Sequence, residues 1–448
     1  MSADRKFFRQ SSWMVIATFA GGFFMALVHT VARKMGNDYG SFVMLLRVLV
    51  IMGIPFAALQ TVVARQAAAA TDEAHELQLI ATARALLFAT FLVWLFYAVI
   101  VLVAAKPLSN LLNITSRSSL YFTLAVALIG LWIPIFKGLL QGRHQFWGLG
   151  WLQITDGVGR FALMLVFVGL LQGKAAGAMC AILAGQLVTV VVGGTLTRRI
   201  WTTRATVRFD WKAWFSGAIP LSFGLGTILI MSSIDMLFVQ SLFEKSQTTL
   251  YSGAMLTGFA IIQFIAPVAL VMFARVAQSV ARKENSGSLG MTLTATILFG
   301  CTAAIGCTLF PKLPLRLMYF TNPDMWNAAP LVPWFAWALL PLTVANVLVQ
   351  HILAKGQFKA VPWLLLIAIG YAAALMLQAP LLLRMASFDA FTRVIQTMGI
   401  ASTLLCLVAA QFTRSRAVAN SSGRNPSGER AISGIASAPT DETSVAKR

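Results

Sequence analysis

Residues 145–165 read QFWGLGWLQITDGVGRFALML, and residues 357–377 read QFKAVPWLLLIAIGYAAALML. The second stretch follows the first at a distance of 212 residues, and eight of the 21 aligned positions are identical, including Trp151 with Trp363. Abundant leucine and alanine produce chance matches in an apolar chain. Matches of tryptophan and of Gln-Phe in one register indicate an internal repeat instead. The chain is therefore predicted to contain two copies of one structural unit.

The amino-acid composition indicates whether this unit lies in water or in a membrane. Of the 448 residues, 58% are hydrophobic and 11% are charged, and the mean hydropathy is +0.77. A soluble domain has about 25% charged residues, so this chain is predicted to be an integral membrane protein. Apolar runs of about 20 residues mark membrane spans. Twelve spans are predicted, over residues 11–32, 40–63, 85–105, 118–139, 149–172, 174–196, 214–243, 247–274, 289–310, 327–353, 361–383 and 389–412.

The repeat distance assigns six predicted helices to each half of the chain. An even number of spans preserves the direction of the chain, so the halves are predicted to be parallel repeats about an axis along the membrane normal. We therefore expect an all-α polytopic fold of two six-helix lobes. The N-terminal lobe is predicted over 1–196, a basic linker over 197–213 and the C-terminal lobe over 214–412. The tail, 413–448, has no apolar period and is predicted to be disordered.

Lysine and arginine indicate the orientation in the membrane. With the N-terminus inside, the cytoplasmic segments hold 23 of these residues and the outer segments hold 10. Cytoplasmic loops carry the excess of positive charge, so both termini are predicted to be cytoplasmic. The same asymmetry explains the net charge of +20 without a nucleic-acid partner.

Two charges interrupt the first copy of the repeat. Asp156 and Arg160 lie one helical turn apart, at positions where the second copy has Ala368 and Ala372. Arg160 lies about 16 Å into its helix at 1.5 Å per residue, a depth at which an arginine costs about 2.5–3.5 kcal/mol. Either the pair fixes its helix to a neighbour, or Arg160 faces a cavity and binds an anionic substrate while Asp156 orients it. Because the second copy lacks both charges, the second interpretation is favoured.

Five other ionisable residues are candidates for function. Arg47, in the second predicted span, either extends to the outer face or faces a cavity. Lys137 and Arg143 lie near the cytoplasmic ends of helices, where they either anchor the helices or meet an anionic headgroup. Asp235, inside the seventh predicted span, is predicted either to pair with an arginine of the first lobe or to bind a coupling ion. His29 lies at the end of the first predicted span, where it is predicted to be either an interfacial residue or a gating residue.

No cofactor or metal site is predicted. The four cysteines lie in apolar runs without a C-x-x-C motif, and the four histidines form no ligand pattern. The sequence contains no nucleotide-binding loop and no catalytic motif. The chain is therefore predicted not to be an enzyme, and any transport by it must be secondary or coupled to other machinery.

Three segments resemble the multidrug/oligosaccharidyl-lipid/polysaccharide exporter superfamily, and within it the branch of lipid-linked oligosaccharide flippases. LLQGRHQFWGLGWLQITDGVGRFALMLVFVGLL (139–171) is similar to the fifth helix of that branch, with an acidic residue and an arginine one turn later. LVIMGIPFAALQTVVARQ (49–66) is similar to the second helix, and the stretch from DMLFVQSLF to ARVAQS (235–279) is similar to the seventh and eighth. The resemblance implies a MATE-like fold with a V-shaped pair of lobes around a central cavity that opens alternately to either face.

The resemblance also implies a function. It suggests a flippase of the bacterial inner membrane for a polyprenyl-pyrophosphate-linked oligosaccharide. Such a protein is expected to use H⁺ or Na⁺ as coupling ion, and to work beside membrane lipids and polysaccharide-assembly proteins.

Three alternatives stay open. A multidrug cation exporter of the same superfamily requires an acidic, aromatic site. A membrane glycan polymerase or ligase requires a sizeable outer loop, and the longest here is 311–326. A major-facilitator transporter requires a basic Gly/Asp/Arg signature after the second helix, where this chain has ARQAAAATDEAHELQ (64–78).

Overall fold

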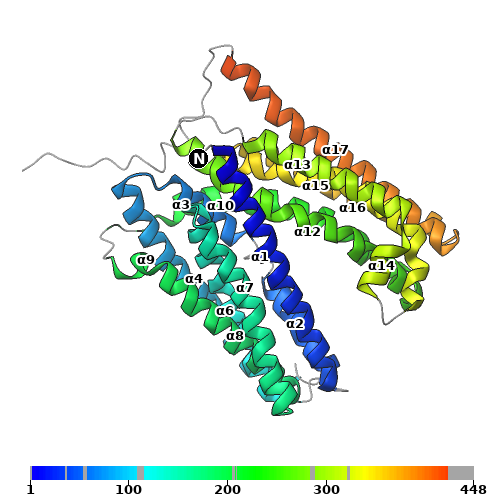
Figure 1. Cartoon of the computed structure of the whole chain (residues 1–448), viewed down its shortest axis with the longest axis horizontal. Helices are drawn as coiled ribbons and strands as arrows, with labels where there is room; N and C mark the ends of the chain where they lie inside the picture. The colour runs from blue at the N-terminus through cyan, green and yellow to red at the C-terminus, as the bar shows by residue number, and fades with distance from the viewer. Residues whose placement is uncertain are drawn as a thin grey trace, which may run out of the picture.

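The structure is a computed structural model that describes residues 3–35, 38–53, 58–107, 116–203, 207, 209–282, 288–319 and 323–421. All regular structure in these ranges is helical, and Figure 1 shows the helices in two groups. Apolar segments fold as helices in a bilayer because their backbone N–H and C=O groups find no water there and must bond within the segment. The predicted all-helical membrane architecture is confirmed.

The first lobe extends from α1 (Ala3–Ala32) to α8 (Lys174–Leu196). Its other elements are η1 (Arg33–Met35), α2 (Asp38–Gly53), α3 (Leu59–Ala69), α4 (Glu73–Val103), α6 (Arg117–Gly142), α7 (Phe146–Met164) and the short π-helical segment η3 (Leu165–Leu170). α7 packs between α1 and α8, and α6 packs between α8 and α3.

The second lobe extends from α10 (Trp211–Met231) to α17 (Ser387–Ser421), and the short helix α9 (Arg198–Thr202) precedes it. Its other elements are α11 (Ile234–Leu242), α12 (Lys245–Ala281), α13 (Ser288–Leu309), α14 (Lys312–Met318), η4 (Pro323–Leu331), α15 (Val332–Ala354), η5 (Phe358–Ala360) and α16 (Val361–Leu382). α15 packs against α12, α13 and α17 and forms the centre of this lobe.

Helices occupy the twelve predicted spans, but several bounds differ, and α4 begins at Glu73, twelve residues before its predicted span. In the described part of the chain, ten helices are individually long and apolar enough to cross a membrane. The predicted span 40–63 corresponds to the two helices α2 and α3, and the predicted span 214–243 is divided at Ser232 and Ser233 into α10 and α11. Helix α17 continues through Ser421, whereas residues 422–448 of the predicted tail lie outside the described part.

Glycines bring α7 unusually close to both of its neighbours. A Cβ atom on Gly21 of α1 would lie 2.6 Å from the carbonyl oxygen of Gln153, and Gly157 of α7 faces the backbone of Gly21 in return. On the other side, a Cβ atom on Gly185 of α8 would lie 2.6 Å from the backbone nitrogen of Arg160. Small residues allow membrane helices to approach at backbone distance, so α1, α7 and α8 are held together closely.

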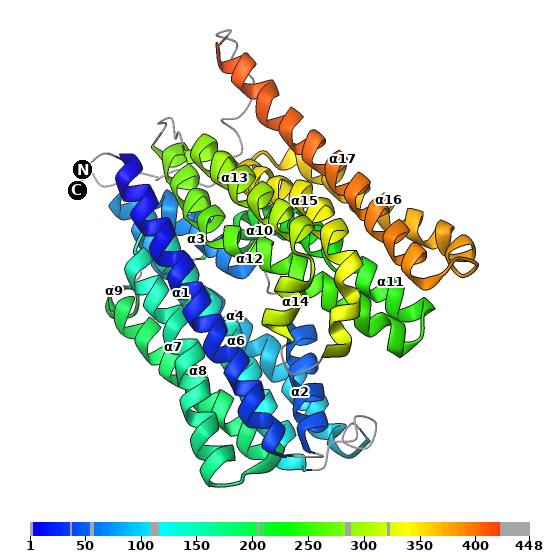
Figure 2. The same ribbon diagram turned by 45° about the vertical axis from the view of Figure 1, so that its right-hand side comes forward.

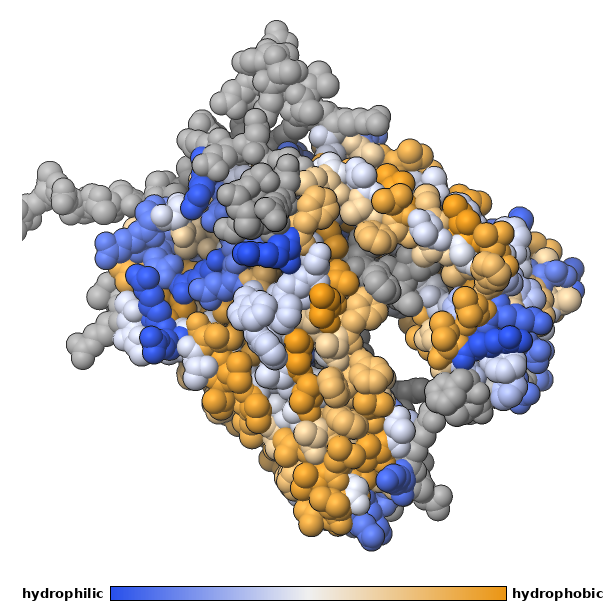
Figure 3. Space-filling view, in the orientation of Figure 1, coloured by the Kyte–Doolittle hydropathy of each residue, from blue (hydrophilic) through white to orange (hydrophobic). Residues whose placement is uncertain are grey.

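The two lobes meet at one end of the molecule and diverge toward the other. α12 of the second lobe packs against α1, α3 and α6 of the first, and α10 packs against α3. We call this end, which carries the N-terminus of α1, the closed end. Figure 2 shows the lobes separating from there toward α2, and Figure 3 shows an opening between them. Hydrophobic side chains cover the visible flanks of the first lobe, and hydrophilic ones lie toward its ends (Figure 3).

Candidate functional site

Asp156 and Arg160 form an ion pair on α7. Nε and one terminal nitrogen of Arg160 donate to Oδ1 of Asp156 at 2.9 and 2.6 Å. The side chains are 10% and 14% exposed, so the pair is largely removed from solvent. Its geometry follows from the spacing of four residues, which places both side chains on one face of a helix.

Lys137 joins this pair from α6. Its ammonium nitrogen lies 3.9 Å from Oδ2 of Asp156 and donates a hydrogen bond of 2.8 Å to Oε1 of Gln153. The side chain is 14% exposed. The sequence places Lys137 near a helix end, and the structure shows that the crossing of α6 and α7 brings it to Asp156.

Gln186 of α8 completes the arrangement. With its amide oxygen toward Arg160, it accepts from a guanidinium nitrogen at 3.0 Å, while its amide nitrogen donates to the carbonyl of Val126 at 3.0 Å. We call Lys137, Gln153, Asp156, Arg160 and Gln186 the polar cluster. It contains two cations and one carboxylate and therefore carries a net charge of +1. Sequence analysis missed both glutamines, because only the packing of three helices brings them to the charges.

Lys137 brings the polar cluster of the first lobe close to the end at which the two lobes meet. Gln141 follows Lys137 by one turn on the same face of α6, and its amide nitrogen donates to the carbonyl of Leu270 on α12 at 3.2 Å. The backbone rises about 6 Å between these two positions. Lys137 is thus about one helical turn from a direct contact between the lobes.

Arg143 has an acidic partner inside the first lobe. It forms an ion pair with Glu76, which lies in the first turn of α4. That pair joins the end of α6 to the start of α4. The structure does not bring Arg143 into the polar cluster.

Tyrosines that correspond in the repeat bind His29 and Asp235. Tyr39 hydrogen-bonds Nδ1 of His29 at 3.3 Å, and Tyr251 donates to Oδ2 of Asp235 at 2.7 Å. The two tyrosines are 212 residues apart, whereas His29 and Asp235 are 206 residues apart and do not occupy equivalent positions. Arg47 lies on α2, but its side chain is outside the described part of the chain.

Asp235 is fully buried in the second lobe. Its Oδ1 atom has no hydrogen-bond partner among the described residues, and neither has the hydroxyl of Tyr371. Tyr371 is 2% exposed and interacts electrostatically with Asp235. The ion pairs of the described residues include none between Asp235 and an arginine. Three buried oxygen-bearing side chains, Asp235, Tyr251 and Tyr371, therefore form a separate group.

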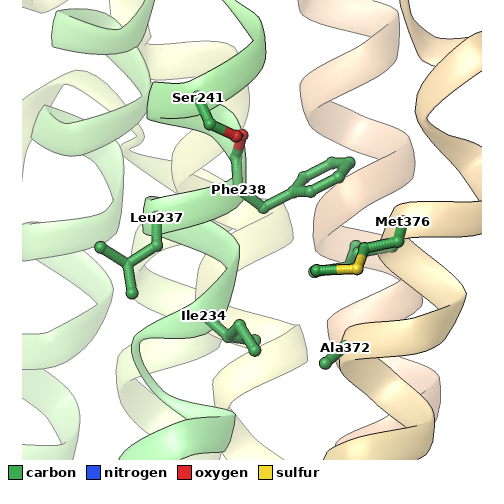
Figure 4. A pocket seen from close by; sticks show the side chains of 7 residues that line it. Ile234, Leu237, Phe238, Ser241, Ala372 and Met376 are labelled. Atoms are coloured by element: carbon green, nitrogen blue, oxygen red, sulfur yellow. The ribbon is translucent and has the colours of Figure 1, made fainter.

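An apolar cavity of about 300 Å³ lies between α11 and α16. Its lining includes Leu237, Phe238, Leu375 and Met376, with the hydroxyl of Ser241 at one end (Figure 4). None of the described residues that line it is charged. This cavity suits an apolar group and not a charged headgroup.

The two lobes of apolar helices and the charged cluster within the first lobe are typical of a multi-pass membrane transporter. A family model described as polysaccharide biosynthesis protein matches residues 39–279. The chain therefore belongs to the polysaccharide biosynthesis protein family, within the superfamily that the sequence resembles. No curated protein is similar enough to this chain to count as a relative.

Solved structures of MATE transporters share the fold. A mutant of the Vibrio cholerae MATE transporter VcmN is 13% identical, with 92% of this chain and 97% of that chain covered and a TM-score of 0.74. An outward-facing multidrug resistance MATE family transporter is also 13% identical, covers 92% and 96% and has a TM-score of 0.72. A transporter of this superfamily from Pyrococcus furiosus has the same identity and coverage, and a TM-score of 0.71. The predicted two-lobe, MATE-like fold is thus confirmed.

Proposed function

We propose that this protein flips a polyprenyl-pyrophosphate-linked oligosaccharide across the bacterial inner membrane by alternating access. The family supports a role in polysaccharide biosynthesis, and the fold supports transport. The observation that carries the choice of substrate is the net positive charge of the polar cluster. A pyrophosphate would bind there, the sugars would occupy the space between the lobes, and the prenyl chain would stay in the lipid.

The chemistry of the polar cluster favours an anion. Arg160 already has a carboxylate partner, so the charge of Lys137 at 3.9 Å from Asp156 is compensated only in part. A buried charge without a close partner is costly, and a phosphate oxygen would supply the missing negative charge. Arginine binds phosphate through two parallel N–H donors, which strengthens such a contact. A cationic drug would meet repulsion at the same place, which disfavours the multidrug exporter.

The shape of the molecule agrees with one state of the proposed cycle. With both termini in the cytoplasm, the closed end is the cytoplasmic end, and the lobes diverge toward the outer face. This is the outward-facing state of a flippase. The group of Asp235, Tyr251 and Tyr371 is the proposed place for a coupling H⁺ or Na⁺, because Oδ1 of Asp235 and the hydroxyl of Tyr371 have no hydrogen-bond partner among the described residues.

A binding experiment with the purified protein tests the proposal. Binding of a short-chain polyprenyl-pyrophosphate glycan is compared with binding of the same glycan on a neutral lipid and of a cationic dye. We expect preference for the pyrophosphate in the native protein, and loss of that preference in Lys137→Ala and Arg160→Ala. Lys359→Ala, at an exposed site on the second lobe, is the control and should bind normally. Equal binding of the neutral glycolipid, or preference for the dye, would contradict the proposal.

A further inference from the structure

Gln141 connects three helices at the closed end. Its amide oxygen accepts a hydrogen bond of 2.9 Å from Gln60 on α3, and its amide nitrogen donates to the carbonyl of Leu270 on α12. The first bond lies within one lobe, and the second joins the two lobes. The side chain is 3% exposed. Both functional groups of this buried amide are therefore used, one of them across the boundary that must open during transport.

Opening of the closed end removes the partner of one of these groups. When α12 moves away from α6, the amide nitrogen of Gln141 loses the carbonyl of Leu270. Water enters as this end opens and can replace the carbonyl, so the net cost of losing the bond corresponds to only about a fivefold change in the equilibrium between the closed and open states. The carbonyl of Leu270 lies inside α12 and can keep its helical hydrogen bond, so the donor of Gln141 bears most of this cost. The closed state is thereby stabilised as long as no acceptor stronger than water is near.

A substrate anion at Lys137 would be such an acceptor. Lys137 and Gln141 lie one turn apart on the same face of α6, and a pyrophosphate is long enough to contact both. An ionised oxygen is also a stronger acceptor than a backbone carbonyl.

We propose that Gln141 is a positioning residue that switches its donor from the carbonyl of Leu270 to the bound anion, and so couples occupancy of the polar cluster to opening of the closed end. This inference rests on the anion site of the proposed function. No proton is transferred: one N–H···O hydrogen bond breaks as another forms, and Gln60 keeps Gln141 in place throughout.

Distances between the lobes test the switch. Spin labels at Ala74→Cys on the first lobe and Lys359→Cys on the second, both exposed sites at the closed end, report separation by double electron–electron resonance. The four native cysteines are replaced, and the probe is inorganic pyrophosphate. In otherwise native protein, we expect pyrophosphate to increase the population of the longer distance.

Two matched variants separate the switch from a simple stabilising contact. Gln141→Met removes the bond to Leu270, and Gln10→Met removes a second interlobe bond, in which Arg275 donates to Gln10 at 2.9 Å. Loss of the neutral bond of Gln141 should raise the ratio of open to closed protein about fivefold, and loss of the bond from the charged Arg275 should raise it by at least as much. Only Gln141→Met should lose the response to pyrophosphate. Gln141→Glu retains the acceptor for Gln60 but not the donor, and should lose the response as well.

The outcomes distinguish the switch from the anion site. Pyrophosphate binding is measured separately by calorimetry in the native protein and in Lys137→Ala. If pyrophosphate binds at Lys137 but Gln141→Met still opens in response, the switch is refuted and the anion site stands. If native protein does not bind pyrophosphate, both are refuted. A response lost equally in Gln10→Met would also refute the switch, since any weakening of the closed end would then be sufficient.

Discussion

Removing the charges of the Asp156–Arg160 pair one at a time and together should separate structure from substrate binding. Asp156→Ala leaves Lys137 and Arg160 largely buried without their shared carboxylate, which should destabilise the protein by about 3–5 kcal/mol. Arg160→Ala should destabilise the protein less, because Asp156 still has the ammonium group of Lys137 as a partner, which lies 3.9 Å away in the native protein. We expect a loss of about 1–3 kcal/mol in the free energy of unfolding. The double variant removes opposite charges together and should be about 2 kcal/mol more stable than Asp156→Ala alone.

The measurements are the free energy of unfolding in mixed micelles and transport in proteoliposomes. If Arg160 binds the substrate, the double variant should recover stability but not transport. Arg160→Lys should retain partial transport, since lysine supplies the charge but not the two parallel donors. Full transport by a well-folded double variant would refute the assignment of the anion site. A double variant no more stable than Asp156→Ala would refute the energetic argument.

Three further predictions concern topology, coupling and a helix end. Reporter fusions should place 197–213 in the cytoplasm and 311–326 outside, and a fusion within 197–213 that reports the outer compartment would refute this orientation. Asp235→Asn should reduce gradient-driven transport but retain substrate binding. Undiminished transport across a series of pH values and Na⁺ concentrations would refute the coupling role and indicate that Asp235 is structural. The hydrogen bond from the backbone N–H of His75 holds the pKa of Asp72 below its usual value. Its stabilisation of α4 is therefore present above the unfolded-state pKa and lost as the pH falls through the folded-state pKa. Asp72→Ala should accordingly speed amide exchange in the first turn of α4 at neutral pH, and an equal effect in strong acid would contradict this.

The sequence predicts those features that depend on neighbours along the chain. The spans follow from apolar runs, and the ion pair of Asp156 and Arg160 follows from the spacing of four residues on a helix. The contacts of Lys137 and Gln186 with this pair do not follow, because helical periodicity shows which residues share a face but not which helix that face meets. The burial of Asp235 depends in the same way on α12 and α16, which pack around it.

The close contacts of α7 have a consequence for selectivity. Because glycines hold α7 at backbone distance from both α1 and α8, the helix cannot rotate or slide without its neighbours. Since α6 in turn packs extensively on α8, the spacing of Lys137 and Arg160 is preorganised before a ligand arrives, and little conformational entropy is lost on binding. A rigid pair of cations also accommodates a poorly fitting anion only at a cost. We therefore expect the site to discriminate between a monophosphate and a diphosphate by geometry, and to do so equally well whichever face of the membrane the cavity opens to.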